Sequence, residues 1–302
     1  MLNTRHLKVF NAVCKDMNMT KASNELYISQ PAISKTISEI EEYYGRTLFE
    51  RRNKTLLLTP DGKRLYEYSS QVLNLMEKMD QSMAEANQKD IVRAGASITV
   101  GTSILAEITR AYREKCPQTQ IVATVDNTDV IERALLDSKL DLAMVEGDIY
   151  SRAIQTEPLG DTEIVLVVNR DHPLYGRENV TVEDLKDMDF IVREEGSKTR
   201  ARFSMEMSKT DVRWYAAWSC HNTQAIKNAV DAGLGIGVLS KLSVRRRLQT
   251  GRFWAITPFD TPLTLHLHIA YRKKTYFTKA LDEFKEFMLQ RFRLIEMDGY
   301  TN

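Results

Sequence analysis

Residues 18–40 read NMTKASNELYISQPAISKTISEI, in which two helical patterns are joined by a tight connection at Tyr27–Ser29. We expect Thr20 to cap the earlier of these two helices, which contains Ala22 and Leu26, because a Thr hydroxyl can accept a hydrogen bond from the free N–H groups of a helix start. The second helix begins at Gln30-Pro31, since Pro loses little at a position where its missing N–H would have no partner.

The helix that begins at Gln30 has one apolar face and one polar face. Ile33, Ile37 and Ile40 form a buried stripe at helical spacing. The opposite face carries short hydrogen-bonding side chains, where a solvated helix usually carries long Lys and Glu. Short donors and acceptors at a helix start suit the reading of base edges in a major groove. The alternative is the ordinary polar face of a small three-helix unit.

A helical pattern precedes this stretch and a basic hairpin follows it. Residues 7–17 place apolar side chains three and four residues apart, which predicts a first helix. Residues 46–59, RTLFERRNKTLLLT, predict two short strands around an Asn53-Lys54 turn, with cationic side chains at its tip. Beside a reading helix, such a hairpin would contact phosphates or the minor groove. The alternative is a solvated turn.

Residues 5–64 resemble the winged helix-turn-helix of the LysR-type transcriptional regulators. The matching residues are Leu7, Phe10, Thr20-Lys21-Ala22-Ser23, Leu26, Ser29 to Lys35, Ile37, Ile40-Glu41, Gly45, Leu48 to Arg51 and Leu58 to Gly62. Ser23 stands where the family usually has Ala. Lys35 stands where Arg is frequent, which keeps the charge and loses bidentate recognition of guanine. The resemblance and the pattern together nominate as DNA contacts Thr20, Ser29, Gln30, Pro31, Ala32, Ser34, Lys35, Thr36, Arg51, Arg52 and Lys54.

A long helical stretch runs from Thr59 to about Lys89. Its apolar positions fit a heptad, with Leu65, Val72, Met79 and Ala86 at one site and Ser69, Met76 and Met83 at the other. Such a seam favours pairing with a second copy of the chain, and the alternative is packing on the chain's own body. The resemblance implies a linker helix that joins two heads in a homodimer or homotetramer. Residues 90–97, DIVRAGAS, are expected to form a hinge.

From Ser97 onward, predicted strands alternate with predicted helices, which indicates a parallel, helix-covered sheet. The first lobe has strands at 98–101, 120–125 and 140–145 and helices at 104–116 and 131–138. Residues 163–169 cross to a second lobe, which has strands at 190–193 and 235–240 and helices at 182–187 and 223–232. Residues 263–272 return to the first lobe, and 277–292 form a closing helix.

Three segments of this region are similar to the periplasmic-binding-protein-like effector domain of the same family. They are Val230 to Leu239, Leu140 to Ala143 and Asp171 to Leu174. The predicted fold is therefore α/β and multidomain. It comprises a winged helix-turn-helix at 1–58, a linker helix at 59–90 and a two-lobed effector domain at 91–302, with lobe I at 91–167 and 268–302 and lobe II at 168–267.

In open α/β sheets, ligands bind beyond the carboxyl ends of the strands. At those ends we predict an effector site formed by Thr102, Ser103, Thr128, Glu146, Ser197, Thr199 and Asn222. Ser103 at a helix start would favour an anionic oxygen, with Lys198 and Arg200 nearby and Glu146 available to a cationic end. We therefore expect a small-molecule effector and favour an anionic one. The alternative is that these Ser and Thr residues only cap helices.

Composition narrows the classes of protein. The chain has 302 residues, of which 43% are apolar and 27% charged, so wholesale disorder is excluded. Residues 1–65 carry 11 Lys and Arg against 7 Asp and Glu, a net +4, whereas the remainder is net −3. No apolar run of about 18 residues and no secretory signal occur, so we expect a cytoplasmic protein without a membrane partner. The three cysteines suggest no disulfide framework.

No catalytic set is evident. His266 and His268 share a strand face without a third metal ligand, and Cys220-His221 are adjacent, so on a strand they would point apart. The Gly-rich stretch at 233–237 lacks a nucleotide-binding motif, so we expect no cofactor. Because no third metal ligand is evident, we also expect no metal. The predicted function is a sequence-specific, effector-controlled transcriptional regulator that binds double-stranded DNA. The alternative is a solute-receptor type of binding protein. The resemblance also implies RNA polymerase as a further partner.

Overall fold

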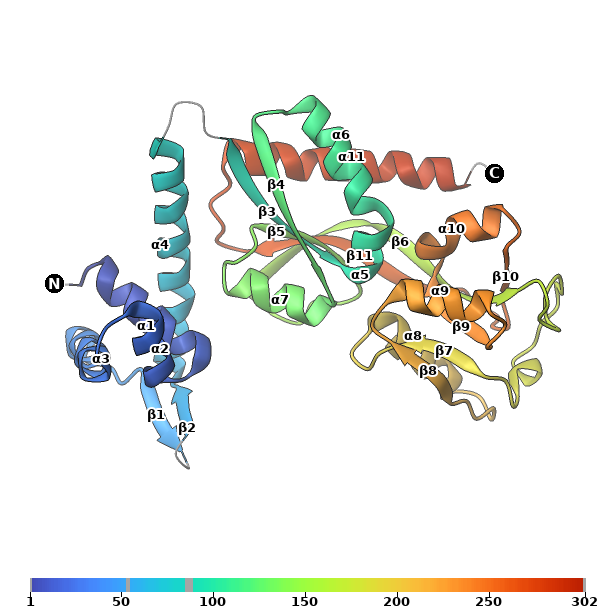
Figure 1. Ribbon diagram of the computed structural model, residues 1–302, viewed down its shortest axis with the longest axis horizontal. Coiled ribbons are helices and arrows are strands. Elements are labelled where there is room, and N and C mark those ends of the chain that lie inside the picture. The colour runs from blue at the N-terminus through green and yellow to red at the C-terminus, as the bar shows by residue number, and fades with distance from the viewer. Residues whose placement is uncertain (1, 53–54, 85–88, 301–302) are drawn as a thin grey trace. The chain divides into compact units, whose positions relative to one another are not determined.

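The computed structural model describes residues 2–52, 55–84 and 89–300 (Figure 1). The chain divides into two compact units. One comprises Met1–Gln88 with Leu136–Lys139, and the other comprises Lys89–Leu135 with Leu140–Asn302. Within the described residues, no helix combines the length and the apolar content that crossing a bilayer requires.

The N-terminal unit is a helix-turn-helix followed by a hairpin. Its elements are α1 (Thr4–Asp16), α2 (Met19–Leu26), α3 (Gln30–Tyr44), β1 (Phe49–Arg52), β2 (Thr55–Leu58) and α4 (Pro60–Ala84). The predicted stripe of Ile33, Ile37 and Ile40 is buried and packs with Phe10 and Val13 of α1. β1 and β2 pair antiparallel, as predicted, whereas the Asn53-Lys54 turn, including the candidate contact Lys54, lies outside the described residues.

The prediction that Thr20 caps α2 is wrong. Asn18 is the cap, and its side-chain oxygen accepts hydrogen bonds from the backbone N–H groups of Thr20 (2.9 Å) and Lys21 (3.0 Å). Asn and Thr are both good caps, so residue type alone did not decide whether Asn18 or Thr20 would cap the helix. Because Thr20 lies inside the first turn of α2, its hydroxyl is exposed and available for another role.

Asn18→Ala is expected to lower the free energy of unfolding of the N-terminal unit by about 1 kcal/mol, because two N–H groups lose their acceptor. Thr20→Ala should change it by less than about 0.5 kcal/mol, as exposed substitutions usually do. Urea denaturation followed by circular dichroism measures both. Equal losses for the two variants would contradict the assignment of Asn18 as the cap.

Helix α4 has a face toward α1 and an exposed apolar face. On the first, Asn11 donates to Ser69 Oγ (2.6 Å) and Ser70 donates to Asn11 Oδ1 (2.7 Å). Ser69 is therefore buried within its own unit, not in the predicted heptad seam. The exposed face presents Val72, Met79 and Met83 of the predicted seam, together with Leu75. Ala86, the last seam residue predicted, lies outside the described residues.

The C-terminal unit contains one nine-stranded sheet with the order β4-β3-β5-β11-β6-β9-β7-β8, and β10 pairs with β6. The strands are β3 (Asp90–Ser97), β4 (Thr119–Asp126), β5 (Leu142–Glu146), β6 (Ile154–Asn169), β7 (Phe190–Arg193), β8 (Ala216–Cys220), β9 (Ile236–Ser240), β10 (Phe253–Ile256) and β11 (Leu263–Arg272). β3, β4 and β5 run parallel in lobe I, and β7, β8 and β9 run parallel in lobe II. The alternation predicted from the sequence is confirmed.

The segment 90–101 differs from its prediction. Residues 90–97, expected to be a hinge, form β3 between β4 and β5. Residues 98–101, expected to be a strand, begin a continuous helical run made of α5 (Ile98–Val100), a π-helical segment η1 (Gly101–Leu105) and α6 (Ala106–Lys115). Small residues suit β3 because it is covered on both faces. A side chain at Gly95 would collide with those of Leu140 and Ile131.

Helices cover both faces of each lobe. In lobe I, α6 and α11 (Lys279–Tyr300) pack on one face, and α7 (Thr128–Leu136) covers the other (Figure 1). In lobe II, α8 (Lys198–Met207) lies on one face, while α9 (Thr223–Asp231) and α10 (Lys241–Gln249) lie on the opposite face. A single 3-10 turn, η2 (Glu183–Leu185), stands where a short helix was predicted. Sequence reasoning missed α8, β8, α10 and β10.

Two antiparallel strands, β6 and β11, connect the lobes. β11 pairs with β5 of lobe I through residues 267–270, and β6 pairs with β9 of lobe II through residues 164–167. The two strands pair with each other over the whole of β11, from Leu263 opposite Ile164 to Arg272 opposite Ile154. Their register shifts once, where Leu267 opposes Gly160 and His268 opposes Pro158, so Leu159 forms a bulge.

Candidate functional sites

Helix α3 presents the polar face that the sequence predicted for reading DNA. Ser29 is its N-cap, and Ser29, Gln30, Pro31, Ser34 and Lys35 are exposed. Ala32 and Thr36 are half-buried at the edge of this face. Ser29 Oγ accepts a hydrogen bond from Ala32 N at 3.4 Å, and Lys35 Nζ lies 3.9 Å from Glu39. These contacts are long, so the side chains can turn toward another acceptor.

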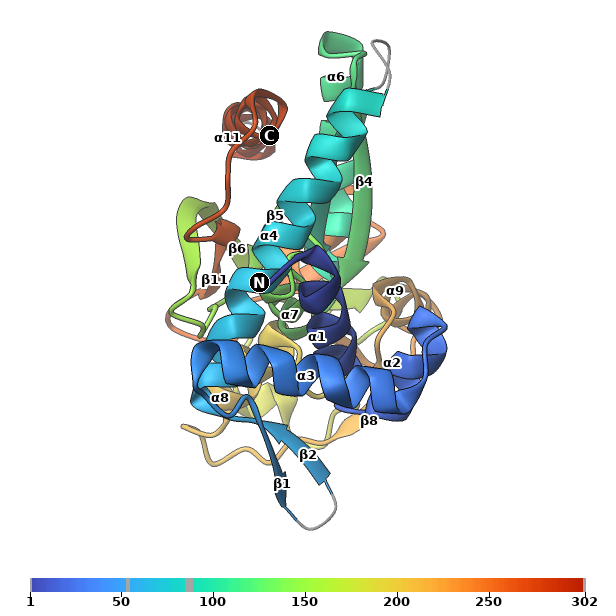
Figure 2. The same ribbon diagram turned by 90° about the vertical axis from the view of Figure 1, so that its left-hand side faces the viewer.

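The hairpin is fixed to α3 by one carboxylate. Glu41 Oε1 of α3 accepts hydrogen bonds from the backbone N–H groups of Leu48 (2.6 Å) and Phe49 (3.3 Å) at the start of β1. Figure 2 shows α3 crossing the N-terminal unit with the β1–β2 hairpin extending beneath it. Arg51 is exposed on β1, and Arg52 ends that strand. A rigid mount of this kind places a basic hairpin in a constant position relative to α3.

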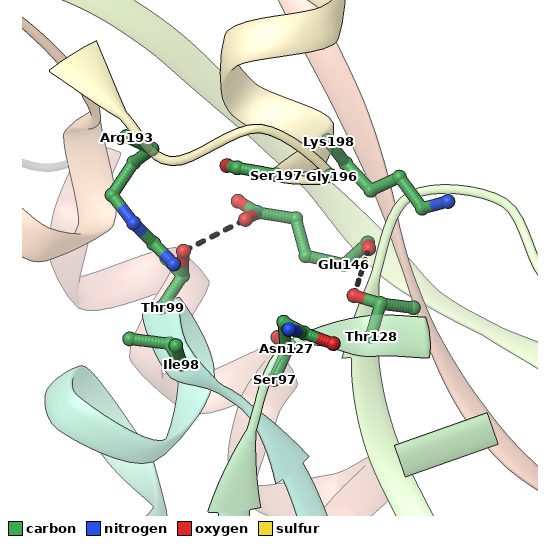
Figure 3. Close-up of a pocket in the computed structure, with 10 residues that line it drawn as sticks. All are labelled: Ser97, Ile98, Thr99, Asn127, Thr128, Glu146, Arg193, Gly196, Ser197 and Lys198. Carbon is green, nitrogen blue, oxygen red and sulfur yellow. Dashed lines mark hydrogen bonds between the residues drawn. The ribbon is translucent and has the colours of Figure 1, made fainter. Parts of the chain in front are cut away.

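The C-terminal unit has a pocket between its two lobes (Figure 3). It encloses about 250 Å³ of space free of atoms, part of it open to solvent. Lobe I and lobe II both contribute, and the lining residues are Ser97, Ile98, Thr99, Asn127, Thr128, Glu146, Arg193, Gly196, Ser197 and Lys198. The pocket therefore lies where the carboxyl ends of β3, β4, β5 and β7 meet, as expected for this class of sheet.

Three helices begin at this pocket. Ser97 precedes the helical run from Ile98 to Lys115, Asn127 precedes α7, and Ser197 precedes α8. Neither Ser97 nor Ser197 uses its hydroxyl as a helix cap. The first backbone N–H groups of a helix lack intrahelical partners and carry partial positive charge, so this arrangement favours a negatively charged group.

Glu146 ends β5 at the inner side of the pocket, with 4% of its surface exposed. Thr99 donates a hydrogen bond to Glu146 Oε2 at 2.7 Å, and Thr128 donates to the Glu146 backbone oxygen at 3.0 Å. Burial raises the pKa of Glu146. The Thr99 hydrogen bond, the charge of Arg193 and the nearby hydroxyls of Ser240 and Thr199 oppose that rise in pKa without cancelling it.

Two cations at the pocket are already paired. Arg193 donates to Glu194 through Nε (2.7 Å) and Nη2 (2.8 Å), and each residue is only 5% exposed. Lys198 Nζ lies 3.1 Å from Asp129 Oδ1 and 4.6 Å from the centre of the Tyr150 ring. The Arg193–Glu194 pair holds Arg193 at the pocket wall, since a bidentate contact fixes the plane of the guanidinium.

Comparison with known proteins places both units in one family. Residues 4–63 match the model of the bacterial regulatory helix-turn-helix protein of the lysR family, and residues 86–293 match the model of the LysR substrate binding domain. The chain belongs to the LysR family of transcriptional regulators. It is thus a DNA-binding transcriptional regulator with an effector-binding domain, and the solute-receptor alternative leaves residues 4–63 unexplained.

Individual relatives cover nearly the whole chain. The regulator YeiE of Escherichia coli K12, described as an uncharacterized HTH-type transcriptional regulator, is 32% identical over 95% of this chain and 97% of its own. CysL of Bacillus subtilis is 29% identical over 80% and 82%. Among solved structures, ArgP from Mycobacterium tuberculosis has a TM-score of 0.72 at 16% identity and covers 97% of this chain and 98% of its own. A full-length OxyR variant from Pseudomonas aeruginosa has a TM-score of 0.68 at 19% identity and covers 97% and 95%.

In this LysR-family chain, the structure gathers some of the predicted effector residues and separates others. Thr128, Glu146 and Ser197 line the pocket, and Thr199 is buried close enough to act on the pKa of Glu146. Thr102, Ser103 and Asn222 do not line it. Thr102 Oγ1 donates to the Ile98 oxygen (2.8 Å) within the helix, Ser103 Oγ is buried, and Asn222 caps α9 by accepting from Gln224 N.

The lining residues that sequence reasoning missed are Ser97, Ile98, Thr99 and Arg193, whereas Lys198, expected near the site, does line the pocket. Arg193 had a usable signal. It ends the apolar run Phe190–Val192 and is followed at once by an acidic residue, so a buried ion pair at a strand end could be predicted. Ser97 and Thr99 were hidden by the wrong strand boundary at 98–101.

The histidine and cysteine side chains weighed as metal ligands or nucleophiles lie in surroundings that do not favour either role. His266 Nδ1 lies 2.6 Å from Asp161 Oδ1, and the described residues contain no cluster of three or more His, Cys, Asp or Glu side chains that could hold a metal ion. Cys14, Cys116 and Cys220 are free thiols. Burial raises the pKa of Cys220, whereas a nucleophilic thiol needs a lowered pKa.

Proposed function

We propose that this LysR-family regulator reads duplex DNA with the exposed face of α3 and the β1–β2 hairpin, and that a small, anionic effector in the pocket at Glu146 controls it. The observation that carries the DNA part is the exposed polar row of α3 on an apolar Ile stripe. Within this proposal the candidate base contacts are Gln30, Ser34 and Lys35, because side chains at a helix start reach base edges. Arg51, Arg52 and Lys54 supply phosphate contacts.

We infer that two copies pair through α4. Support comes from the exposed apolar row of Val72, Leu75, Met79 and Met83, which a second copy of the same helix would cover. Paired heads then read two half-sites related by two-fold symmetry. A homotetramer would be formed from two such dimers.

We propose that the effector acts by changing the angle between the lobes. Both lobes line the pocket, so a ligand there contacts groups from each, and it favours whichever lobe arrangement it binds more tightly. The protein acts by binding and not by catalysis, and its DNA target places it in the cytoplasm. We propose RNA polymerase as a further partner in this role.

The test compares specific with non-specific DNA binding. The best duplex selected by the full-length protein from a random library serves as the specific probe, and a scrambled duplex serves as the non-specific one. Ser34→Ala/Lys35→Ala should weaken specific binding by about 100-fold and non-specific binding by less than about tenfold, because base contacts carry specificity.

Arg51→Ala is the matched control, because it removes one exposed cation from the hairpin without touching α3. It should weaken both probes alike and reduce the slope of log affinity against log salt by about one. If the α3 variant lost equal affinity for both duplexes, α3 would not read bases.

A further inference from the structure

The pocket contains two buried oxygens without a hydrogen-bond partner in the described part of the chain. They are Glu146 Oε1 and Ser97 Oγ, on residues that are 4% and 3% exposed, and both residues line the pocket. Burying a polar atom without a partner is costly, so native proteins rarely leave one in that state. Figure 3 shows the Glu146 side chain reaching inward across the pocket toward Thr99.

The bonding of Glu146 indicates which oxygen would hold a proton. Thr99 donates to Oε2, so Oε2 acts as an acceptor. A proton on this carboxyl therefore belongs on Oε1, which is the oxygen without a partner. A protonated Oε1 is a donor that needs an acceptor in the pocket.

The charged groups around Glu146 do not offer it a cation of its own. Arg193 makes a bidentate contact with Glu194, and Lys198 contacts Asp129. Next to Glu146 on the paired strand β11, His266 contacts Asp161, and burial lowers the pKa of His268. At the start of α10, Lys241 contacts Glu163 at 2.7 Å. An ionised Glu146 would thus be a buried carboxylate surrounded by the hydroxyls of Thr99, Ser240 and Thr199, and burial raises its pKa despite them.

We propose that the pocket binds a small oxyanion only while Glu146 is protonated, with Glu146 Oε1–H donating a hydrogen bond to an oxygen of the ligand. The three helix starts and the Ser97 hydroxyl supply the remaining donors. An ionised Glu146 would repel the same ligand across a short distance in a poorly solvated site. This inference rests on the proposed effector pocket and adds a proton requirement to it.

The direction of the pH dependence follows from linkage. A bound anion stabilises the protonated form, so the pKa of Glu146 is higher in the complex than in the empty pocket. Affinity is therefore constant below the pKa of the empty pocket. Above that value it falls by about tenfold per pH unit until the pKa of the complex is reached.

Sulfate is a suitable probe because it does not titrate near neutral pH. Its affinity for the full-length protein is measured by isothermal titration calorimetry between about pH 6 and about pH 9. The wild-type affinity should fall across this range. Glu146→Gln keeps a neutral donor at this position, so it should bind sulfate with constant affinity and exceed the wild type by at least about tenfold at the upper end.

Glu195→Gln is the matched control, since Glu195 is 91% exposed on its side chain and does not line the pocket. It should reproduce the wild-type fall. Constant wild-type affinity, or affinity that rises with pH, would overturn the proton requirement. So would a complete lack of sulfate binding, or binding that Ser97→Ala and Ser197→Ala leave unchanged. None of these outcomes bears on DNA reading by α3, which the duplex-selection assay tests separately.

Discussion

Arg193→Ala is expected to lower the free energy of unfolding of the C-terminal unit by about 3–5 kcal/mol, because it leaves the Glu194 carboxylate buried without its cation. The two donors of Arg193 contact Glu194 at 2.7 and 2.8 Å, and both residues are almost fully buried. Removing one partner exposes the full desolvation cost of the other, which exceeds the net value of the pair.

Tryptophan fluorescence during urea denaturation measures this change, because Trp214, Trp218 and Trp254 all lie in the C-terminal unit. The double variant Arg193→Ala/Glu194→Ala should lose less than the sum of the two single variants, since neither charge is then left alone. Arg200→Ala, which removes contacts to the Arg193 oxygen (3.3 Å) and Ser219 (3.2 Å), should cost less than about 1 kcal/mol. A loss below about 1 kcal/mol for Arg193→Ala would show that Glu194 finds another partner.

Val72→Glu/Met79→Glu should convert the protein to a monomer and weaken its binding to a two-half-site duplex by about 100-fold or more. Both side chains lie on the exposed apolar row of α4. The substitutions remove the apolar contacts of Val72 and Met79 across the proposed seam. They also place two carboxylates of each copy opposite those of the other copy, and these like charges repel. A single head also loses the high effective concentration that a paired head provides.

Analytical ultracentrifugation gives the oligomeric state, and fluorescence anisotropy gives the affinity. Val72→Leu/Met79→Leu is the matched control, because it keeps the row apolar and should leave both readouts within about twofold of the wild type. If the Glu variant remained a dimer, the proposal that α4 pairs through this row would be wrong.

The N-terminal fold was readable from the sequence because local signals agree there. The Ile stripe of α3, the Pro at its start and the turn at Tyr27 all point to one arrangement, and each is found in the structure. The error at Thr20 was of another kind. Asn18 and Thr20 have similar capping ability, and only the geometry of the turn after α1 selects Asn18.

The start of the C-terminal unit shows where local signals fail. Residues 98–100 are β-branched and suggested a strand, yet they begin a helix. Residues 90–97 include small side chains typical of a loop, yet they form a strand between β4 and β5, where a larger residue at Gly95 would collide with Leu140. This packing decides the boundary, and it cannot be read from residues 90–101 by themselves. The wrong strand boundary also misplaced the predicted effector site. Thr102 and Ser103 were predicted to line it, whereas Ser97 and Thr99 do.

The two strands that join the lobes limit how this regulator can respond. β6 and β11 both run from one lobe to the other as extended strands, so drawing the lobes apart would have to stretch both backbones, whereas twisting the ribbon would not. The bulge at Leu159 is the place where that ribbon is easiest to bend, since a bulged residue has no partner in the ladder. A ligand between the lobes can therefore act by changing the twist of this pair of strands, and the pair returns to its own twist when the ligand leaves.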